Sequence, residues 1–398
     1  MVLKANSPKD NFKFKILKMD YSKYHDTYKE ITLFGRYITL DNIEPLLLQY
    51  NVEVIGKSVL GKSIYKYQIG SGNIKILMWS QMHGNESTTT KALFDIINFL
   101  HANTSESQAI LKMFTFCMLP MLNPDGAKLY TRENANSIDL NRDAQNLSQP
   151  ESQILRSVFN EFQPNYCYNL HDQRTIYGVA DTGKPATVSF LAPAYNENRD
   201  VNEVRLEAMR IIVAMNKTLQ NYIPNQVGRF DDSFNLNCVG DTFQSLNVPT
   251  ILFEAGHFQE DYDREKTRKY IFIALMSSFN YSYENVIVSN ENSEYLKIPQ
   301  NKVVFYDIVY KNVSIYYDSI KIISNFAAQF EEVLINNKIL FKAKIAQIDN
   351  LENYFGHVTF DAKGEKYSND NNNIPKIESK ADFYIGKQIK FVNGLPCK

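Results

Sequence analysis

The pattern of apolar and polar residues divides the chain into two parts of different texture. From about residue 38 to residue 280, apolar runs of strand length alternate with longer segments whose apolar residues recur every three or four positions. This alternation is typical of strands joined by crossover helices. It predicts an α/β domain over residues 38–285, with a mixed central sheet and helices on both faces.

The elements of this domain can be placed by residue range. Strands are expected at residues 74–82, 113–122, 165–170 and 248–256. Helices are expected at residues 88–103, 150–162 and 203–223, where the apolar positions would form one helical face.

The texture changes after residues 281–303, a polar stretch that we interpret as a linker. Beyond it, short segments rich in β-branched and aromatic residues are separated by Asn, Asp and Gly. They predict a small all-β C-terminal domain over residues 300–398. The run at 368–373 (SNDNNN) is expected to be a loop of this domain, and residues 1–37 to form an N-terminal extension.

Composition excludes some classes of partner. A formal net charge of −1 over 398 residues provides no basic field for nucleic acid or acidic lipid. No apolar stretch approaches the roughly 20 residues of a membrane span, and the first residues carry no apolar segment of a signal peptide. The four cysteines are widely spaced, which suits a reducing compartment. We therefore expect a cytoplasmic protein without nucleic-acid or membrane partners, of unknown oligomeric state.

Residues able to bind a metal or move a proton occur at the ends of three expected strands. His83 and Glu86 follow one strand, His171 follows another, and Glu254 lies near the end of a third. The carboxyl ends of such strands line the site in open α/β sheets. Imidazole and carboxylate ligands with one open position suit a hydrolytic zinc site, and a further carboxylate can act as general base. Spacing alone does not choose between His171 and His257 as the second imidazole.

A loop between these positions carries two arginines. Residues 121–143 include an Asn-Pro-Asp-Gly turn and then Arg132 and Arg142, among Asn and Asp residues. A guanidinium group presents a planar fork of donors that matches a carboxylate or a developing oxyanion. The loop is therefore a second source of candidate site residues.

Five motifs carry a resemblance to a known family. In chain order they are HGNE (83–86), NPDG (123–126), RENANSIDLNRD (132–143), NLHDQ (169–173) and ILFEAG (251–256). Their order and rough spacing resemble those of the zinc carboxypeptidases of the pancreatic type, in their bacterial branch. The resemblance covers about residues 40–280 and leaves out the tail.

The resemblance implies a role for each matching residue. It implies one Zn²⁺ ion held by His83, Glu86 and His171, with Glu254 as the general base. Asp139 resembles the carboxylate that orients a zinc-bound imidazole and raises its basicity.

The same resemblance extends to the substrate side of the site. Arg132 resembles the residue that polarises the scissile carbonyl and stabilises the oxyanion. Asn141 and Arg142 resemble the pair that grips the terminal carboxylate of the substrate. His257 would then be a residue of the rim.

The sequence departs from the family pattern in one important place. The family usually has a tyrosine upstream of the catalytic glutamate, whose hydroxyl caps the bound substrate, but residues 228–241 contain none. Asp231, Asp232 or Phe234 is expected in that neighbourhood. If either aspartate faces the pocket, it would attract a basic or amine-bearing side chain.

The expected function is that of a zinc metallocarboxypeptidase, which hydrolyses the C-terminal amide bond of a peptide or peptide-like substrate with a free carboxylate. Two alternatives share the zinc site: a cytoplasmic murein-peptide amidase and a deacylase of small N-acyl amino acids. An alternative of another class is a catalytically inactive binding protein.

Overall fold

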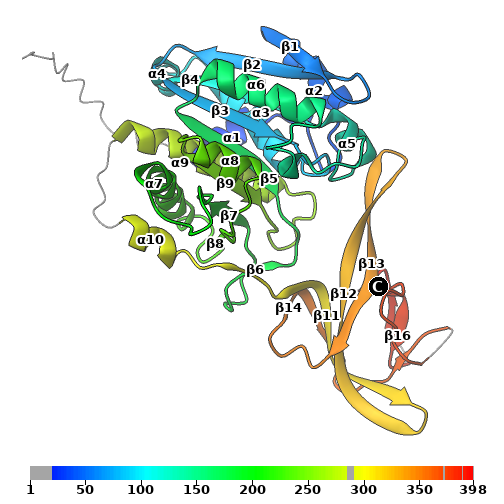
Figure 1. Ribbon diagram of the computed structural model, residues 1–398. Helices are drawn as coiled ribbons and strands as arrows, with labels where there is room; N and C mark the ends of the chain where they lie inside the picture. The colour runs from blue at the N-terminus through cyan, green and yellow to red at the C-terminus, as the bar shows by residue number, and fades with distance from the viewer. Residues whose placement is uncertain (1–19, 285–290, 371–372, 388, 398) are drawn as a thin grey trace, which may run out of the picture.

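The architecture consists of an α/β body and an elongated β region that extends from it (Figure 1). The computed structural model describes residues 20–284, 291–370, 373–387 and 389–397. Within these residues, no helix combines the length and the apolar character needed to cross a membrane.

The body is built on a mixed eight-stranded sheet. In spatial order its strands are β1 (Val52–Lys57), β2 (Ser63–Gly70), β4 (Phe114–Leu119), β3 (Ile74–Ser80), β5 (Tyr166–Asp172), β9 (Thr250–Ala255), β7 (Val188–Leu191) and β8 (Val227–Arg229). The inner strands β4, β3, β5 and β9 run parallel, whereas β1, β2 and β7 make antiparallel pairs.

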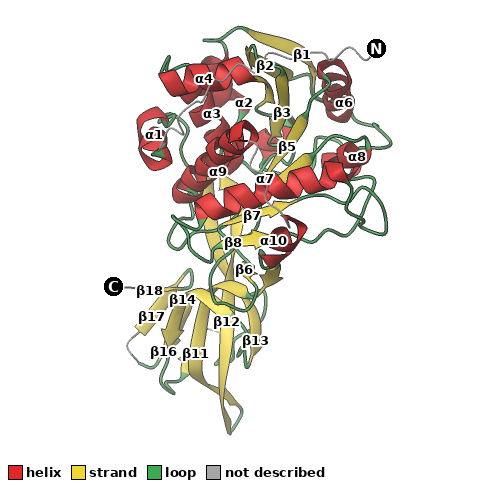
Figure 2. Cartoon of the chain, turned by 90° about the vertical axis from the view of Figure 1, so that its left-hand side faces the viewer, coloured by secondary structure: helices red, strands yellow, loops and turns green. Residues whose placement is uncertain are grey.

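Both faces of the sheet are covered, as the sequence predicted (Figure 2). Ile76 and Met78 of β3 pack in one core, together with α3 (Thr88–Leu100), α7 (Glu203–Leu219) and α9 (Glu265–Glu284). Leu77 and Trp79 point to the opposite face and pack with α6 (Pro150–Phe162) and α8 (Val239–Ser245). Because successive strand residues alternate between faces, one continuous apolar run supplies both cores.

Shorter helices complete the body. They are α1 (Tyr21–Tyr28), α2 (Leu40–Leu47), α4 (Ser105–Met113), α5 (Pro124–Leu129), α10 (Glu291–Lys297) and the 3₁₀ turn η1 (Leu140–Arg142). The expected helix at 150–162 begins and ends where predicted, because Pro150 suits the first turn and Gln163 takes a left-handed conformation after the last. Each expected strand is present. Its observed ends lie within three residues of the expected ones.

The linker prediction for residues 281–303 was wrong for most of that stretch. Helix α9 continues to Glu284, and the stretch also contains α10 and the strand β10 (Asn301–Val303). The hydroxyl of the buried Tyr295 accepts a hydrogen bond from the backbone N–H of Ala192, and β10 pairs with β6 (Tyr177–Val179). This polar stretch is therefore partly folded onto the body, while residues 285–290 lie outside the described part.

The C-terminal region is all β, as predicted, but its strands are longer than the short segments expected. One sheet has the order β13 (Lys338–Asp349), β12 (Ile320–Ile335), β11 (Phe305–Tyr317) and β14 (Phe355–Asp361). The second contains β15 (Tyr367–Ser368), β16 (Phe383–Ile385), β17 (Ile389–Val392) and β18 (Leu395–Pro396). Tyr310, Phe326 and Phe383 are buried between them. Of the loop expected at 368–373, Ser368 belongs to β15 and residues 371–372 lie outside the described residues.

Candidate active site

The parallel strands of the body place chemically active residues at one edge of the sheet. The chain crosses from β3 to β4 on one side of β3, and later returns to β5 on the other side. Such a switch in strand order opens a crevice at the carboxyl ends of the strands. His83 and Glu86 follow β3, and His171 lies near the end of β5, so both sides of this crevice contribute.

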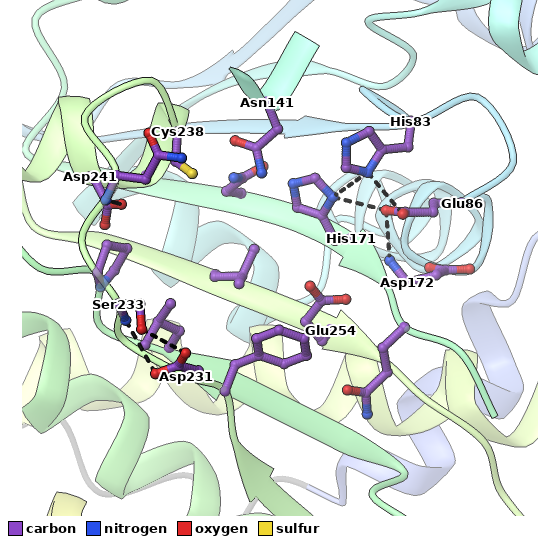
Figure 3. Close-up of a pocket in the computed structure, with 18 of the residues that line it drawn as sticks. His83, Glu86, Asn141, His171, Asp172, Asp231, Ser233, Cys238, Asp241 and Glu254 are labelled. Atoms are coloured by element: carbon purple, nitrogen blue, oxygen red, sulfur yellow. Dashed lines mark hydrogen bonds and ion pairs between the residues drawn. The ribbon is translucent and has the colours of Figure 1, made fainter. Parts of the chain in front are cut away.

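His83, Glu86 and His171 meet at a single point in the crevice (Figure 3). The Nδ1 atoms of His83 and His171 are 3.1 Å apart. The two carboxylate oxygens of Glu86 lie 2.8 Å from these nitrogens, one oxygen against each ring. The backbone N–H of Asp172 donates to Glu86 Oε2 at 3.1 Å and so fixes the carboxylate in place.

Asp139 orients the ring of His83 from behind. It lies just before η1, and its Oδ1 accepts a hydrogen bond from His83 Nε2 at 3.0 Å. With its proton on Nε2, His83 presents the lone pair of Nδ1 to the centre of the site. Burial lowers the pKa of His83, but the carboxylates of Glu86 and Asp139 outweigh burial and hold the pKa above its ordinary value.

The environment of His171 differs from that of His83. Its Nδ1 faces Glu86 and His83, whereas its Nε2 is buried without a hydrogen-bond partner among the described residues. Burial therefore dominates and lowers the pKa of this imidazole, which favours the neutral form that binds metals. Burial raises the pKa of Glu86, but His83 and His171 reverse this effect and keep it an anion.

Glu254 supplies a carboxylate that is separate from this cluster. Its side chain points toward the cluster from β9, is only 8% exposed, and has one oxygen without a partner among the described residues (Figure 3). Burial, followed by the charges of Glu86 and Asp172, raises the pKa of Glu254 well above that of an ordinary glutamate. A raised pKa makes this carboxylate a stronger base.

Arg132 reaches the same point from the loop after α5. Its Nη1 atom lies 3.1 Å from His83 Nδ1 and 3.4 Å from Glu86 Oε1. Asp139 Oδ2 accepts a hydrogen bond from its Nε atom at 3.1 Å and forms an ion pair with its Nη2 atom at 3.0 Å. The guanidinium group is therefore oriented by Asp139, while its side chain stays 41% exposed to the cavity.

Asn141 and Arg142 lie beside each other on η1 and line the same cavity. Asn141 Oδ1 accepts a hydrogen bond from the backbone N–H of Val239 at 3.0 Å, so its NH₂ group is left as a donor. Arg142 is exposed, and its Nη1 donates to the carbonyl oxygen of Asn141 at 2.8 Å. Together they provide amide and guanidinium donors for an anionic ligand.

The cavity has a volume of about 600 Å³ and an acidic end away from the histidines. Asp231, Ser233, Cys238 and Asp241 line this end (Figure 3). Asp231 is exposed and accepts hydrogen bonds from the hydroxyl and the backbone N–H of Ser233 at 2.7 and 3.2 Å. Asp241 is 5% exposed, and burial raises its pKa to about 7 despite a hydrogen bond from the Asn235 amide.

The expected acidic pair is split by the structure. Asp231 and Phe234 line the cavity, but Asp232 forms ion pairs with Arg205 and Arg199 at 2.6 and 3.5 Å instead. The sequence alone could not show that Asp232 lies outside the cavity, because its two arginine partners are about 30 residues earlier in the chain.

The implied rim position of His257 was wrong. This histidine is 1% exposed and is not among the residues that line the cavity. Its ring packs 4.1 Å from that of His357 in β14, measured between centroids. The choice that spacing left open therefore falls on His171, which alone of the two lies against His83.

Sequence reasoning missed several polar residues of the cavity, among them Arg174, Tyr177 and Asp241. Arg174 follows β5, Tyr177 is the first residue of β6, and Asp241 lies in the first turn of α8. Arg174 and Tyr177 carry no spacing signal, since an irregular segment brings them back over the sheet edge. Tyr177 packs against Phe230 with 5.4 Å between ring centroids, so a tyrosine does reach the cavity, from a different element than the family pattern suggested.

The chemistry of the cluster fits a metal ion. His83, Glu86 and His171 offer ligand atoms that all lie within 4.8 Å of one another. Within the described ranges they are the one group of three or more His, Cys, Asp or Glu residues that does so. Two nitrogens and a carboxylate oxygen form a donor set that zinc favours. Nearby, one carboxylate oxygen of Glu254 has no hydrogen-bond partner among the described residues, so it could accept a proton from a water molecule.

Comparison with known proteins agrees with this geometry. Residues 49–230 match the profile of a family described as zinc carboxypeptidase. Carboxypeptidase SOL1 of Arabidopsis thaliana is 26% identical over 162 residues, which are 34% of this chain and 33% of the relative. The chain thus matches about a third of the length of that curated relative.

A solved structure with a TM-score of 0.50 shares the fold. A crystal structure of a candidate carboxypeptidase A from Shewanella denitrificans covers 61% of this chain and 68% of its own, with a TM-score of 0.50 and 18% identity. A metallocarboxypeptidase from Pseudomonas aeruginosa, in complex with (2-guanidinoethylmercapto)succinic acid, covers 61% and 68%, with a TM-score of 0.48 and 16% identity.

The matched range includes His83, Glu86 and His171, while Glu254 lies beyond it and joins the site through the sheet. In its sequence over residues 49–230 and in its fold, the chain is similar to the zinc carboxypeptidase family.

Proposed function

We propose that the protein is a zinc-dependent metallocarboxypeptidase that hydrolyses the C-terminal amide bond of peptides. The convergence of His83, Glu86 and His171 beside a separate buried carboxylate, Glu254, carries this proposal. Two histidines and one glutamate are the zinc ligands of carboxypeptidase A and thermolysin.

In this proposal His83, Glu86 and His171 hold one zinc ion. When bound, zinc supplies a Lewis acid that acidifies water and polarises a carbonyl group. Asp139 fixes the tautomer of His83 that such binding requires, through the 3.0 Å hydrogen bond to Nε2.

Glu254 is the general base. Its carboxylate removes a proton from the attacking water, whose oxygen adds to the amide carbon, and then delivers that proton to the leaving amine. The position of Glu254 beside the cluster and its raised pKa support this role.

Arg132 stabilises the negative charge that develops on the carbonyl oxygen. Its Nη1 atom lies near the ligand atoms of His83 and Glu86, and Asp139 holds the group in orientation. Donors fixed before the reaction stabilise a developing charge without further reorganisation.

Arg142 and Asn141 bind the terminal carboxylate of the substrate. Their donors face the same cavity as the histidine cluster, which sets the reacting bond close to the chain end. An enzyme that requires a free carboxylate trims C-termini and leaves internal bonds intact.

The acidic end of the cavity supports a basic or amine-bearing side chain next to the scissile bond. Asp231 and Asp241 both line that end, and neither forms an ion pair within the described residues. A cation placed there would meet carboxylates in a partly dry environment, where charge pairing is strengthened. We also place the enzyme in the cytoplasm, since all four cysteines are free.

One experiment tests the proposal. The zinc-loaded chain is offered blocked dipeptides that end in Lys, Arg, Leu or Glu, each as the free acid and as the amide. Turnover of the free acids with little turnover of the amides is expected. A diaminopimelate-containing murein peptide and an N-acyl amino acid test the two related hydrolases. Zinc bound at one ion per chain without turnover of any substrate would favour the inactive binding protein.

A further inference from the structure

The C-terminal β region reaches back to the body through the hairpin of β12 and β13, whose tip lies beside α5 (Figure 1). Glu332 of β12 divides its carboxylate between two residues of the body. Oε1 lies 3.1 Å from Nη1 of Arg36, and Oε2 accepts a hydrogen bond from the hydroxyl of Tyr130.

Both partners of Glu332 are connected to the loop 83–87, Arg36 by its own carbonyl oxygen and Tyr130 through the next residue. The residue after Tyr130 is Thr131, whose carbonyl oxygen accepts a hydrogen bond from the Asn85 N–H at 3.1 Å. The carbonyl oxygen of Arg36 accepts a hydrogen bond from Ser87 Oγ at 2.6 Å. One carboxylate thus joins two segments that hydrogen-bond to this loop, at Asn85 and at Ser87.

Tyr130 also sets the start of the segment that carries Arg132. It ends α5 in the left-handed conformation, with φ 58° and ψ 43°, which a residue with a side chain rarely adopts. The ring is held by the edge of Tyr37, 6.3 Å between centroids, and by the hydrogen bond to Glu332. The direction in which the chain leaves toward Arg132 therefore depends on where this ring is anchored.

The ion pair between Glu332 and Arg36 is held together by the burial of the arginine. Arg36 has a side chain that is only 6% exposed, and burial would lower its pKa. The carboxylate of Glu332 is the leading influence against burial, and the pKa of Arg36 rises above its ordinary value. A guanidinium group buried beside its counter-charge resists displacement, because separation would leave it unpaired.

We propose that Glu332 is a positioning residue of the active site, by which the C-terminal β region fixes both the loop 83–87 and the backbone that precedes Arg132. The functional consequence rests on the proposed zinc hydrolase, whereas the contacts themselves do not. The β region would then help to hold His83 and Glu86 of the cluster in position.

Two conservative substitutions test the proposal. Glu332→Gln removes the charge and keeps an acceptor, and Tyr130→Phe removes a single hydroxyl. The matched control is Glu331→Ala on the same strand, because Glu331 forms an exposed pair with Lys344 at 2.8 Å. Amide hydrogen exchange of the metal-free chain is measured at residues 83–87 and in β5 and β9. Zinc affinity by chelator competition, kcat and KM are then measured for each protein.

The expected result is local. In both variants exchange of the Asn85 amide should quicken about tenfold, with the β5 and β9 amides unchanged. Zinc affinity should fall about tenfold, as for other residues that orient ligands, and kcat about 10- to 100-fold with KM within about twofold. Glu331→Ala should match the wild type in each measurement.

Two results would overturn the proposal. Unchanged exchange at Asn85 in both variants would show that the loop is held without the carboxylate. Equal acceleration at Asn85, β5 and β9 would show that Glu332 affects only stability. If the wild type turned over no substrate, the proposed function would fail, while the exchange result would still decide whether Glu332 positions the loop.

Discussion

Glu254 lies directly opposite His171 in the parallel pairing of β9 with β5. Residues paired in this way project their side chains from the same face of the sheet, and neighbouring strands are about 4.8 Å apart. The sheet register therefore places the proposed general base beside a proposed zinc ligand, with no loop between them whose motion could separate the two.

Glu254→Gln should abolish turnover and leave zinc bound. The amide has nearly the shape of the carboxylate, but it cannot accept a proton, so kcat should fall by about two to four powers of ten. Zinc per chain is measured by elemental analysis, and kcat with a blocked dipeptide. Glu260→Gln is the control, since Glu260 is exposed in the loop after β9. Full peptidase activity in the Glu254 variant would remove the proposed base.

Asp139→Asn should weaken zinc binding about 10- to 100-fold. The neutral amide accepts a hydrogen bond from His83 Nε2 more weakly, so Nδ1 becomes a poorer ligand. Affinity is measured by competition with a chelator. Asp143→Asn is the control, because Asp143 is buried and accepts hydrogen bonds from the backbone N–H groups of Ser148 and Gln149. Equal losses of affinity in the two variants would show that Asp139 matters only for folding.

Arg142→Ala should raise KM about 10- to 100-fold with little change in kcat, as expected when hydrogen bonds to a charged group are lost. The amide of the same peptide lacks the carboxylate that Arg142 would bind. The substitution should therefore make no further difference with that substrate. A similar rise in KM for acid and amide would assign Arg142 to another part of the peptide.

Much of the sheet was readable from sequence because its inner strands are buried on both faces. Such strands appear as unbroken apolar runs, and residues after their carboxyl ends gather at one edge. His83 could be placed near the ends of the neighbouring strands for this reason, whereas the choice of His171 over His257 came from the family resemblance. The helix α10 escaped notice because it lies in a polar stretch, and among its described side chains it is Tyr295 that is buried against the body.

The remaining features depend on contacts between residues distant in the chain. Asp232 pairs with Arg205, and Glu332 pairs with Arg36. Neither ion pair can be recognised from the spacing of residues in the sequence, because each joins separate elements. The packing of His257 against His357 is of the same kind, and it keeps out of the cavity a histidine that the family resemblance placed at its rim. Spacing along a chain does not report which charges meet after folding.

The preference for a basic side chain should depend on pH through Asp241. Burial raises the pKa of this carboxyl group to about 7, so it is mainly neutral below pH 7 and mainly charged above it. A cationic side chain gains from the charged form alone. The ratio of kcat/KM for a peptide ending in Lys to that for one ending in Leu should therefore rise as pH increases from 6 to 8.

Asp241→Asn removes the titrating group, and its ratio of kcat/KM for the two peptides should stay nearly constant over the same range. Both peptides see the same zinc site, so pH effects on the reaction itself cancel in the ratio. Asp231 remains in this variant, as a second carboxylate at the same end of the cavity. A residual preference for Lys that does not change with pH would belong to Asp231. A ratio that still rose with pH in the Asp241 variant would exclude Asp241 as the group that titrates.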